Sequence, residues 1–418
     1  MKEKLALLGQ RISAFLGLDM MGKSYSTLTG VYLFLMIYTT LESVFVNTLL
    51  YKISSEMSYV MLYRGITYVA AAVAMHIAAY ISKKLSPIWV VRLGAMLYLV
   101  MYMLLFFGMD NMEVVRHPLA VLSGAAGAFY WSGHNALVLG YTNRQNRDVG
   151  ISILGMISGI ITLLVPVIAG FVISGMPGIW GYRVMFGMGM LAVAVQVYFS
   201  FRLAPLPQRG KKRSYFGLAL QLIRQRSAYR LMLLYEVFRG CRDGVFAFIL
   251  NMLLFEIITN EGLTGVNTFL TGIMAILGSY VYGKLVTPDK RTRFMVLSTS
   301  VLLLTGSILY AAMNVGTLMF FTVVNAFFQL FFINICNNST YDLTSHSRTA
   351  RRCSSEMYAI REIALATGRL IGLGVMSAFP ATQFGYVTVM LLLTALQYVT
   401  ALLMKQAGKK VRRKRQAA

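Results

Sequence analysis

Apolar runs of about 20 residues recur along the whole chain, separated by short polar connections. A helix needs about this length to cross the hydrocarbon core of a bilayer. The runs predict twelve membrane-spanning helices, at 29–51, 59–82, 86–108, 118–140, 149–174, 182–203, 230–256, 264–286, 293–314, 316–340, 355–378 and 383–404. The long connection at 204–229 is basic, opens with two prolines and predicts a linker that carries a short amphipathic helix.

Segments of the first half return in the second half about 200 residues later, with six predicted spans between them. NTLLYKI at 47–53 resembles NMLLFEI at 251–257, and ISKKL at 81–85 resembles VYGKL at 281–285. Two parallel repeats of this kind are a recurring transporter design, with the substrate site between the halves at the bilayer midplane. We therefore expect an all-α polytopic membrane protein made of two pseudo-twofold-related six-helix bundles. The expected organisation is a cytoplasmic N-terminal segment at 1–28, bundles at 29–203 and 230–404 around the linker, and a basic cytoplasmic tail at 405–418.

Composition and charge support this interpretation. The chain is 57% hydrophobic and only 13% charged, which is too little charge for the surface of a soluble domain of 418 residues. Most of its 39 Lys and Arg residues fall in the connections from even to odd spans and at the two ends. The positive-inside rule then places both termini in the cytoplasm. The basic cytoplasmic loops and the compact connections indicate a cell membrane of bacterial type. The net charge of +24 thus marks topology, and nucleic acid is not an expected partner. The three cysteines show no metal or disulfide pattern, and no cofactor is expected.

The connections between the second and third span of each half carry basic motifs. The N-half has AYISKKLSP with Lys83 and Lys84, and the C-half has GSYVYGKLVTPDKRTR with Lys284, Asp289 and Arg291. With the twelve spans, these motifs resemble the major facilitator superfamily of secondary transporters over essentially the full chain. The N-half motif lacks the glycine and the aspartate of the family pattern. The resemblance implies alternating access and a gating role for the five named loop residues.

The fifth span partly resembles the glycine-proline motif of the family's antiporters. Pro166 and Gly170 fit that motif, whereas Val165 and Ala169 stand where glycines are expected. The match favours export, and a plain helix-packing role for these small residues is the alternative.

Glu42 lies near the middle of the first predicted span, and the sequence places no cation within one turn of it. An ionisable group at this depth needs a partner, a wet cavity or a function. We predict that Glu42 couples proton movement to transport, the alternative being a structural carboxylate paired to another helix.

The seventh span contains four ionisable residues in YEVFRGCRDGVFAF. Glu236, Arg239 and Asp243 lie at i,i+3 and i,i+4 spacings, which predicts one network on a single helix face. Arg242 points about 100° away and has no same-helix partner unless Glu236 or another helix reaches it. Either the group is a neutral structural cluster, or Arg239 and Arg242 meet an anionic group of the substrate and Asp243 is a second titrating site.

Further polar residues in predicted spans complete the candidate substrate cavity. The eleventh span supplies Arg361, Arg369 and a third proton-coupling candidate, Glu362. Trp131 could stack on a substrate ring or anchor the interface, and His134 could carry protons or be a hydrogen-bonded structural residue. The remaining candidates are an amide group in the tenth span and two neighbours in the fourth: Asn325, Gln329, Asn334, Tyr130 and Asn135.

The sequence therefore predicts a secondary transporter rather than an enzyme, monomeric in the bilayer, with protons and a small molecule as its partners. Export of a small amphipathic or anionic solute by proton exchange is the first hypothesis. A flippase for a glycolipid or similar amphiphile and proton-driven uptake of a sugar or organic anion are the alternatives. A membrane sensor or an intramembrane enzyme is the alternative outside transport, although no HExxH or GxSG motif is present.

Overall fold

The structure is a computed structural model that describes residues 21–47, 49–50, 57–142, 147–177, 179–206, 215–258 and 261–416. The cytoplasmic segment predicted at 1–28 falls mostly on residues 1–20, which lie outside the described part. The described residues form helices and connections and contain no strand.

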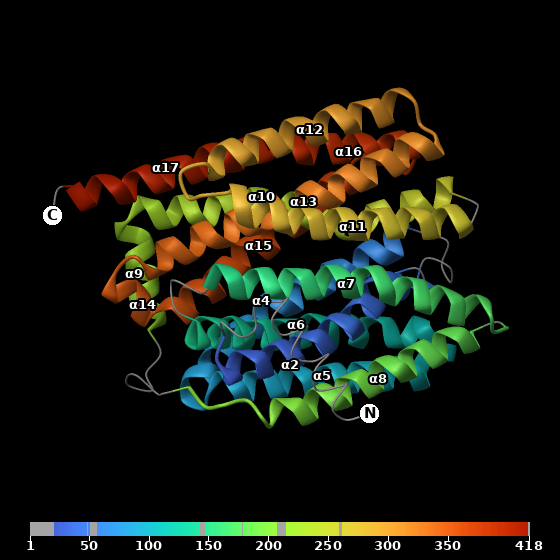
Figure 1. The fold of residues 1–418 in the computed structure, drawn as a ribbon, viewed down its shortest axis with the longest axis horizontal. Coiled ribbons are helices and arrows are strands. Elements are labelled where there is room, and N and C mark those ends of the chain that lie inside the picture. Colours follow the sequence, from blue (N-terminus) through green and yellow to red (C-terminus); the bar gives the residue numbers. More distant parts are fainter. Residues whose placement is uncertain are drawn as a thin grey trace, which may run out of the picture.

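Twelve spanning segments are present in the described part of the chain, in two six-helix bundles (Figure 1). The first bundle, in blue to green, contains α2 (Lys23–Leu41) with η2 (Glu42–Val46), α4 (Met57–Lys84), α5 (Pro87–Gly108), α6 (Met112–Tyr141), α7 (Arg147–Ser174) and α8 (Trp180–Ser200). The second, in yellow-green to red, contains α10 (Ser227–Ile257), α11 (Glu261–Leu285), α12 (Arg291–Ala311), α13 (Val315–Ser345), α15 (Ser354–Ser377), and α16 (Gln383–Ala395) followed by α17 (Gln397–Gln416). The shorter helices are η3 (Met109–Asn111), α9 (Phe216–Gln225), at the place predicted for a linker helix, and α14 (Arg348–Arg352).

Local sequence explains where several helices begin. The Ser86 side chain accepts a hydrogen bond from the Trp89 amide, and Pro87 occupies the first helical position of α5, where its missing N–H costs nothing. Asn314 and Thr317 form a reciprocal capping box at the start of α13. These caps satisfy backbone donors that would otherwise be left open at the membrane surface.

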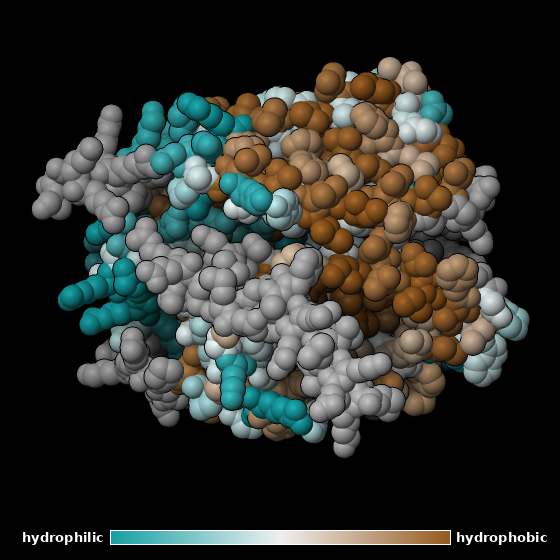
Figure 2. All heavy atoms as spheres, in the orientation of Figure 1, coloured by the Kyte–Doolittle hydropathy of each residue, from teal (hydrophilic) through white to brown (hydrophobic). Residues whose placement is uncertain are grey.

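Polar and apolar side chains are separated along the molecule. In the described residues, eight segments are long and apolar enough to cross a membrane, two of them holding two consecutive helices each. The long helices outside these segments are α2, α10 and α15, and they carry buried ionisable side chains such as Tyr25, Glu236 and Arg361. Hydrophilic residues gather at the left end of Figure 2, where Figure 1 places α9, α14 and the C-terminus, and apolar residues cover much of the remaining visible face. This distribution fits a multi-pass membrane protein.

The two bundles meet along α4 with α15 and along α7 with α11. Where α7 meets α11, a Cβ atom at Gly159 would lie 2.6 Å from Ile276 Cγ1, and one at Gly272 would lie 2.6 Å from Leu163 Cδ1. Small residues allow such close helix approach in a membrane, where packing replaces the hydrophobic effect as the driving force. The Tyr68 hydroxyl on α4 also donates a hydrogen bond of 3.0 Å to the Gly244 carbonyl on α10.

Helices α10 and α15 approach each other more closely still, through two glycine pairs spaced four residues apart. A Cβ atom at Gly240 would lie 2.3 Å from the Leu365 carbonyl oxygen, and one at Gly368 would lie 2.0 Å from that of Val237. Gly244 and Gly372 also leave no room for a side chain. A Cβ atom at these positions would lie 2.7 Å and 2.2 Å, respectively, from a backbone atom of the other helix. Any side chain at these positions would force the two helices apart.

Replacing Gly368 by Ala is therefore expected to lower the free energy of unfolding by about 1–3 kcal/mol, as overpacking does in other tightly packed cores. Gly374→Ala on the same helix is the matched control, since a Cβ atom there meets nothing within 4 Å. Thermal unfolding of the purified protein in detergent measures both variants. Equal midpoints for the two would contradict the close packing of α10 on α15.

Candidate functional site

A fully buried carboxylate, Glu236 on α10, organises the interior of the C-half. Arg361 Nε on α15 donates to Glu236 Oε1 over 2.8 Å, and Arg239 Nη1 donates to Glu236 Oε2 over 3.1 Å. The Thr340 hydroxyl on α13 adds a hydrogen bond of 3.0 Å to Oε1. Three helices thus converge on one acidic side chain.

The network predicted from the spacing in α10 is present in the structure. Arg239 Nε bonds to Asp243 Oδ2 over 2.9 Å in addition to its bond with Glu236. Asn337 Oδ1 accepts from Arg239 Nη1 over 3.1 Å and from Arg361 Nη2 over 2.7 Å. Two arginines face two carboxylates, so the cluster is neutral overall, which a buried ionic group requires.

Arg242 lies outside this cluster and is only 1% exposed. Its Nη2 donates to Asn325 Oδ1 on α13 over 2.7 Å, and Asn325 contacts Gln329 at 3.4 Å. The guanidinium lies 3.9 Å from the ring centre of Phe246 and 4.8 Å from that of Phe332. Among the described residues, Nε and Nη1 have no hydrogen-bond partner and no carboxylate pairs with this arginine. A buried guanidinium that forms no direct ion pair and has two nitrogen atoms without partners is an open position for an anion.

Glu42 is buried in the N-half at the start of a π-helical turn, Glu42–Val46. Such wide turns inside α-helices frequently occur at functional sites. The Ser123 hydroxyl on α6 donates to Glu42 Oε1. A cation does approach from another helix, because Arg64 on α4 interacts electrostatically with Glu42 and donates from Nε to Asn47 Oδ1 over 3.0 Å. In the described part of the chain Glu42 forms no direct ion pair.

The third proton-coupling candidate, Glu362, lies at the interface between the bundles. Arg369 Nη1 bonds to Glu362 Oε1 over 3.3 Å, as the shared helix face predicted. The Arg369 guanidinium also lies 5.2 Å from the ring centre of Tyr68 on α4. The charged side chains of Glu362 and Arg369 therefore lie near the contact between α15 and α4.

The candidates in the fourth span belong to an aromatic cluster of the N-half. His134 is 1% exposed and stacks on Tyr32 of α2 at 5.2 Å and on Tyr130 at 5.5 Å between ring centres. Trp131 is 38% exposed and meets Tyr32 edge-on at 6.1 Å. Asn135 is partly buried beside them. This cluster is distinct from the arginine–carboxylate network of the C-half, as is Asn334, which lies partly buried on α13.

One basic loop residue joins the two bundles. Lys83 Nζ, at the end of α4, lies 2.5 and 2.6 Å from the two carboxylate oxygens of Glu356 in the first turn of α15. Glu356 Oε1 also accepts from the Tyr215 amide, just before α9, over 2.8 Å. The linker helix α9 therefore begins beside the Lys83–Glu356 ion pair.

The other predicted loop residues make contacts within their own bundles. Lys84 Nζ lies 4.8 Å from the ring centre of Tyr80, and Lys284 Nζ lies 4.6 Å from that of Tyr280. Arg291 Nη1 pairs with Asp342 at the end of α13 over 2.7 Å. Asp289 lies in the turn that precedes α12.

Several residues of the site were missed in the sequence. The pairs Gly240–Gly244 and Gly368–Gly372 fit the G-x-x-x-G pattern of close helix packing and could have been found by that signal. Ser123, Asn47 and the roles of Arg64 and Glu356 depend on contacts between distant spans, for which the sequence carries no local signal. Within the described residues no group of His, Cys, Asp and Glu has the arrangement of a metal site.

The fold and the buried charges of its interior define a polytopic membrane transporter. The sequence model of the Major Facilitator Superfamily matches residues 27–260, more than half of the chain. The chain belongs to the Major Facilitator Superfamily.

Two bacterial relatives resemble the chain in sequence. An uncharacterized protein of Bacillus subtilis (strain 168), YqgE, is 23% identical over 336 residues, covering 78% of this chain and 76% of its own length. An uncharacterized protein in the sodM 3′ region of Geobacillus stearothermophilus is 26% identical over 148 residues, covering 35% and 67%.

Solved transporter structures share the fold. The human organic anion transporter MFSD10 (TETRAN) matches with a TM-score of 0.69 at 14% identity, covering 91% of this chain and 98% of that one. FucP in its outward conformation matches with a TM-score of 0.68 at 12% identity over the same shares. A bacterial homologue of the iron transporter ferroportin, outward-facing, matches with 0.67 at 14% identity, covering 92% and 100%. At these identities the likeness concerns the fold alone.

Proposed function

We propose that the protein is a proton-coupled transporter of an organic anion that works by alternating access. The observation that carries the proposal is Arg242, a buried guanidinium with two nitrogen atoms that lack partners among the described residues. A charged group in the membrane interior is expensive and needs compensation. A carboxylate or phosphate of a substrate supplies it, and an arginine can bind either group through two parallel hydrogen bonds.

The surroundings of Arg242 suit an amphipathic anion. Asn325 and Gln329 offer amide groups on one side, and the rings of Phe246 and Phe332 offer apolar surface on the other. Such a mixture fits an organic anion better than an inorganic ion or a neutral sugar. Among proteins of the same fold, MFSD10 is an organic anion transporter, which is in line with this substrate class.

Glu42 is proposed as the main proton-coupling residue, with Asp243 and Glu362 as secondary candidates. Its direct partner is the neutral hydroxyl of Ser123, so protonation breaks no ion pair. Asp243 and Glu362 would each have to release an arginine. Among fold neighbours, FucP of E. coli is a fucose:proton symporter, so the fold accommodates proton coupling. Arg64, near Glu42, is in a position to respond electrostatically to its charge.

We place the protein as a monomer in the cell membrane, with both termini in the cytoplasm and the hydrophilic end of Figure 2 on that side. The clustering of Lys and Arg at this end supports the orientation. At this end the Lys83–Glu356 ion pair is proposed as the cytoplasmic gate, with Lys84, Lys284, Asp289 and Arg291 completing the basic loops of the two halves. Export is the proposed direction. It rests on the antiporter-like Pro166 and Gly170, and Gly170 has open space around it, so helix packing does not explain this glycine.

Arg242→Gln is expected to weaken transport of organic anions about tenfold to a hundredfold, the loss that follows from removing a hydrogen-bonded charge. Proteoliposome counterflow with an organic anion, a neutral sugar and a lipophilic cation as separate substrates measures this loss. The matched control is Arg230→Gln, at an exposed position of the same helix. Undiminished anion transport by a folded Arg242→Gln protein would refute the anion site.

Glu42→Gln is expected to abolish substrate-dependent proton movement while substrate exchange at equal pH persists, because the amide cannot take up a proton. A pH-sensitive dye inside the liposomes reports proton movement, and labelled substrate reports exchange. Glu113→Gln, at an exposed position near the start of α6, serves as control. Proton flux equal to that of the unmodified protein would leave Glu42 with a structural role only.

Lys83→Glu is expected to open the gate by charge repulsion with Glu356, and Lys83→Glu combined with Glu356→Lys is expected to close it again. A cysteine placed at His76, which stacks on Phe216 beside the gate, reports opening through its rate of maleimide labelling. The background lacks the native, buried thiols of Cys241, Cys336 and Cys353. Faster labelling in the single variant and recovery in the exchanged pair support the gate. If the exchanged pair labels as fast as the single variant, the ion pair is not the latch.

A further inference from the structure

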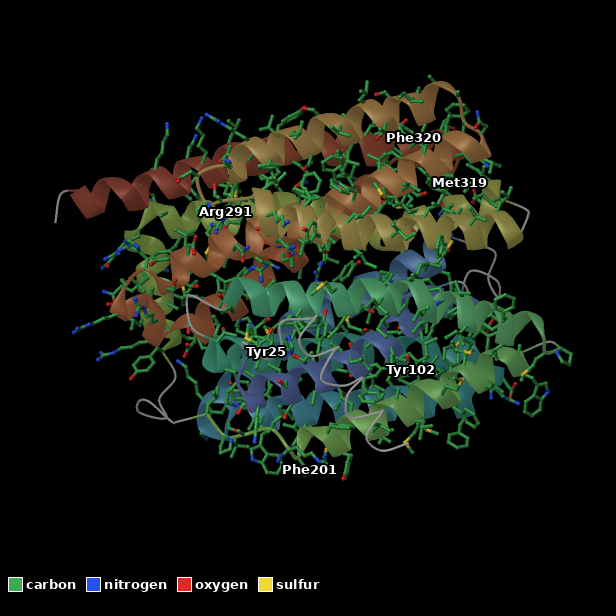
Figure 3. The ribbon with its side chains drawn as sticks, in the orientation of Figure 1. Tyr25, Tyr102, Phe201, Arg291, Met319 and Phe320 are labelled. Carbon is green, nitrogen blue, oxygen red and sulfur yellow. The ribbon has the colours of Figure 1, made fainter. Side chains whose placement is uncertain are left out.

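A large pocket lies at the hydrophilic end of the C-half, away from the buried arginine site. It has a volume of about 1550 Å3 and lies among α12, α13 and α17. Pockets that enclose a small ligand usually measure roughly 300–1,000 Å3, so this one has room for a larger molecule. The pocket residue Arg291 is labelled in Figure 3, on the first turn of α12.

The lining of the pocket is strongly basic. Its cationic residues come from three separate segments: Arg291, Arg293, Arg351, Lys405 and Lys409. Asp289 and Asp342 are the acidic residues of the lining, and Asp342 is already paired with Arg291 over 2.7 Å. The remaining Lys and Arg side chains outnumber the acidic groups, and His346 adds a further nitrogen donor. The pocket therefore attracts an anion.

One wall of the same pocket is apolar and open. Val296 and Leu297, one turn beyond the basic start of α12, line it and are 39% and 50% exposed. Farther along the helix, Leu304 and Ile308 are 65% and 42% exposed, a surface suited to contact with lipid chains. On the same wall of the pocket, the Ser300 hydroxyl lies 2.8 Å from that of Tyr398 at the start of α17. Basic charge at the membrane surface thus continues directly into apolar surface at membrane depth.

We propose that this pocket binds an anionic phospholipid. The phosphate lies among Arg293, Lys405 and Lys409, and the acyl chains follow the exposed face of α12 past Val296 and Leu297. Basic pockets between membrane helices on the cytoplasmic side are known to take up acidic lipid headgroups. A soluble phosphate compound satisfies the basic part of the pocket equally well but leaves the apolar wall uncovered. The combination of the two surfaces therefore points to a lipid.

The proposal is independent of the transported substrate, since the pocket shares no residue with the Arg242 site. Its expected consequence is structural: a lipid between α12 and α17 holds the long C-terminal helix against the bundle. Binding to the folded state alone raises the unfolding midpoint.

The test uses the full-length protein in detergent with added phosphatidylglycerol or phosphatidylcholine, and glycerol 3-phosphate as the soluble source of the same group. Native mass spectrometry counts retained lipids, and thermal unfolding measures stabilisation. Phosphatidylglycerol is expected to be retained and to raise the midpoint more than phosphatidylcholine does. The variant Arg293→Gln, Lys405→Gln, Lys409→Gln is expected to bind phosphatidylglycerol about tenfold or more weakly.

The control variant removes three exposed basic residues elsewhere on the hydrophilic end: Arg202→Gln, Arg224→Gln and Arg230→Gln. It is expected to keep the preference for phosphatidylglycerol. Three results would overturn the proposal: equal retention of the two lipids, equal losses in the two triple variants, or full stabilisation by glycerol 3-phosphate alone. The last result would identify a soluble anion as the occupant.

Discussion

The burial of Glu236 is the constraint on which the C-half depends. An ionised carboxylate with no solvent exposure is tolerated in a membrane interior only when cations and hydrogen-bond donors replace its water. Arg239 and Arg361 supply the cations from two helices, and these helices must approach closely for both to reach the same carboxylate. The facing glycines of α10 and α15 permit this approach, because each leaves room for the backbone of the other helix.

The cluster around Glu236 is neutral without Arg242, so this arginine has surroundings of a different kind. Glu236 and Asp243 are both engaged by Arg239, and among the described residues neither forms an ion pair with Arg242. Arg242 instead faces α13, where it donates to the Asn325 amide and contacts two aromatic rings rather than a carboxylate. The N-half has the opposite arrangement, with Glu42 beside a hydroxyl and its nearby cation bonded to an amide. In the described part of the chain, one half thus carries a buried arginine and the other a buried carboxylate, and neither forms a direct ion pair.

The sequence predicted the spans and the contacts within single helices, because both follow from length and helical spacing. The links from Glu236 to Arg239 and from Arg239 to Asp243, and the seven-residue spacing of Glu362 and Arg369, are of this kind. Contacts between helices could not be predicted, since they depend on rotation and depth of each span. Glu42 illustrates the limit: its π-helical turn alters the local register, and its partner Ser123 is 81 residues away.

The distribution of ion pairs between the bundles bears directly on movement. Among the ion pairs of the described residues, Lys83–Glu356 alone joins one bundle to the other, whereas the pairs of Glu236, Arg239, Glu362 and Arg291 stay within the C-half. The other described contacts between the bundles include glycine-lined helix packing, the contact of Arg369 with the Tyr68 ring, and hydrogen bonds from Tyr68 and Lys83 to backbone carbonyls. A rigid-body rotation of one bundle against the other would thus break a single ion pair at the rim. Glu236, Asp243 and their arginine partners would move together and stay paired, so the rotation would expose no unpaired carboxylate of this cluster to the lipid. A rigid charged interior beside a weakly bonded interface is a physical condition for the rigid-body rocking by which repeat-built transporters work.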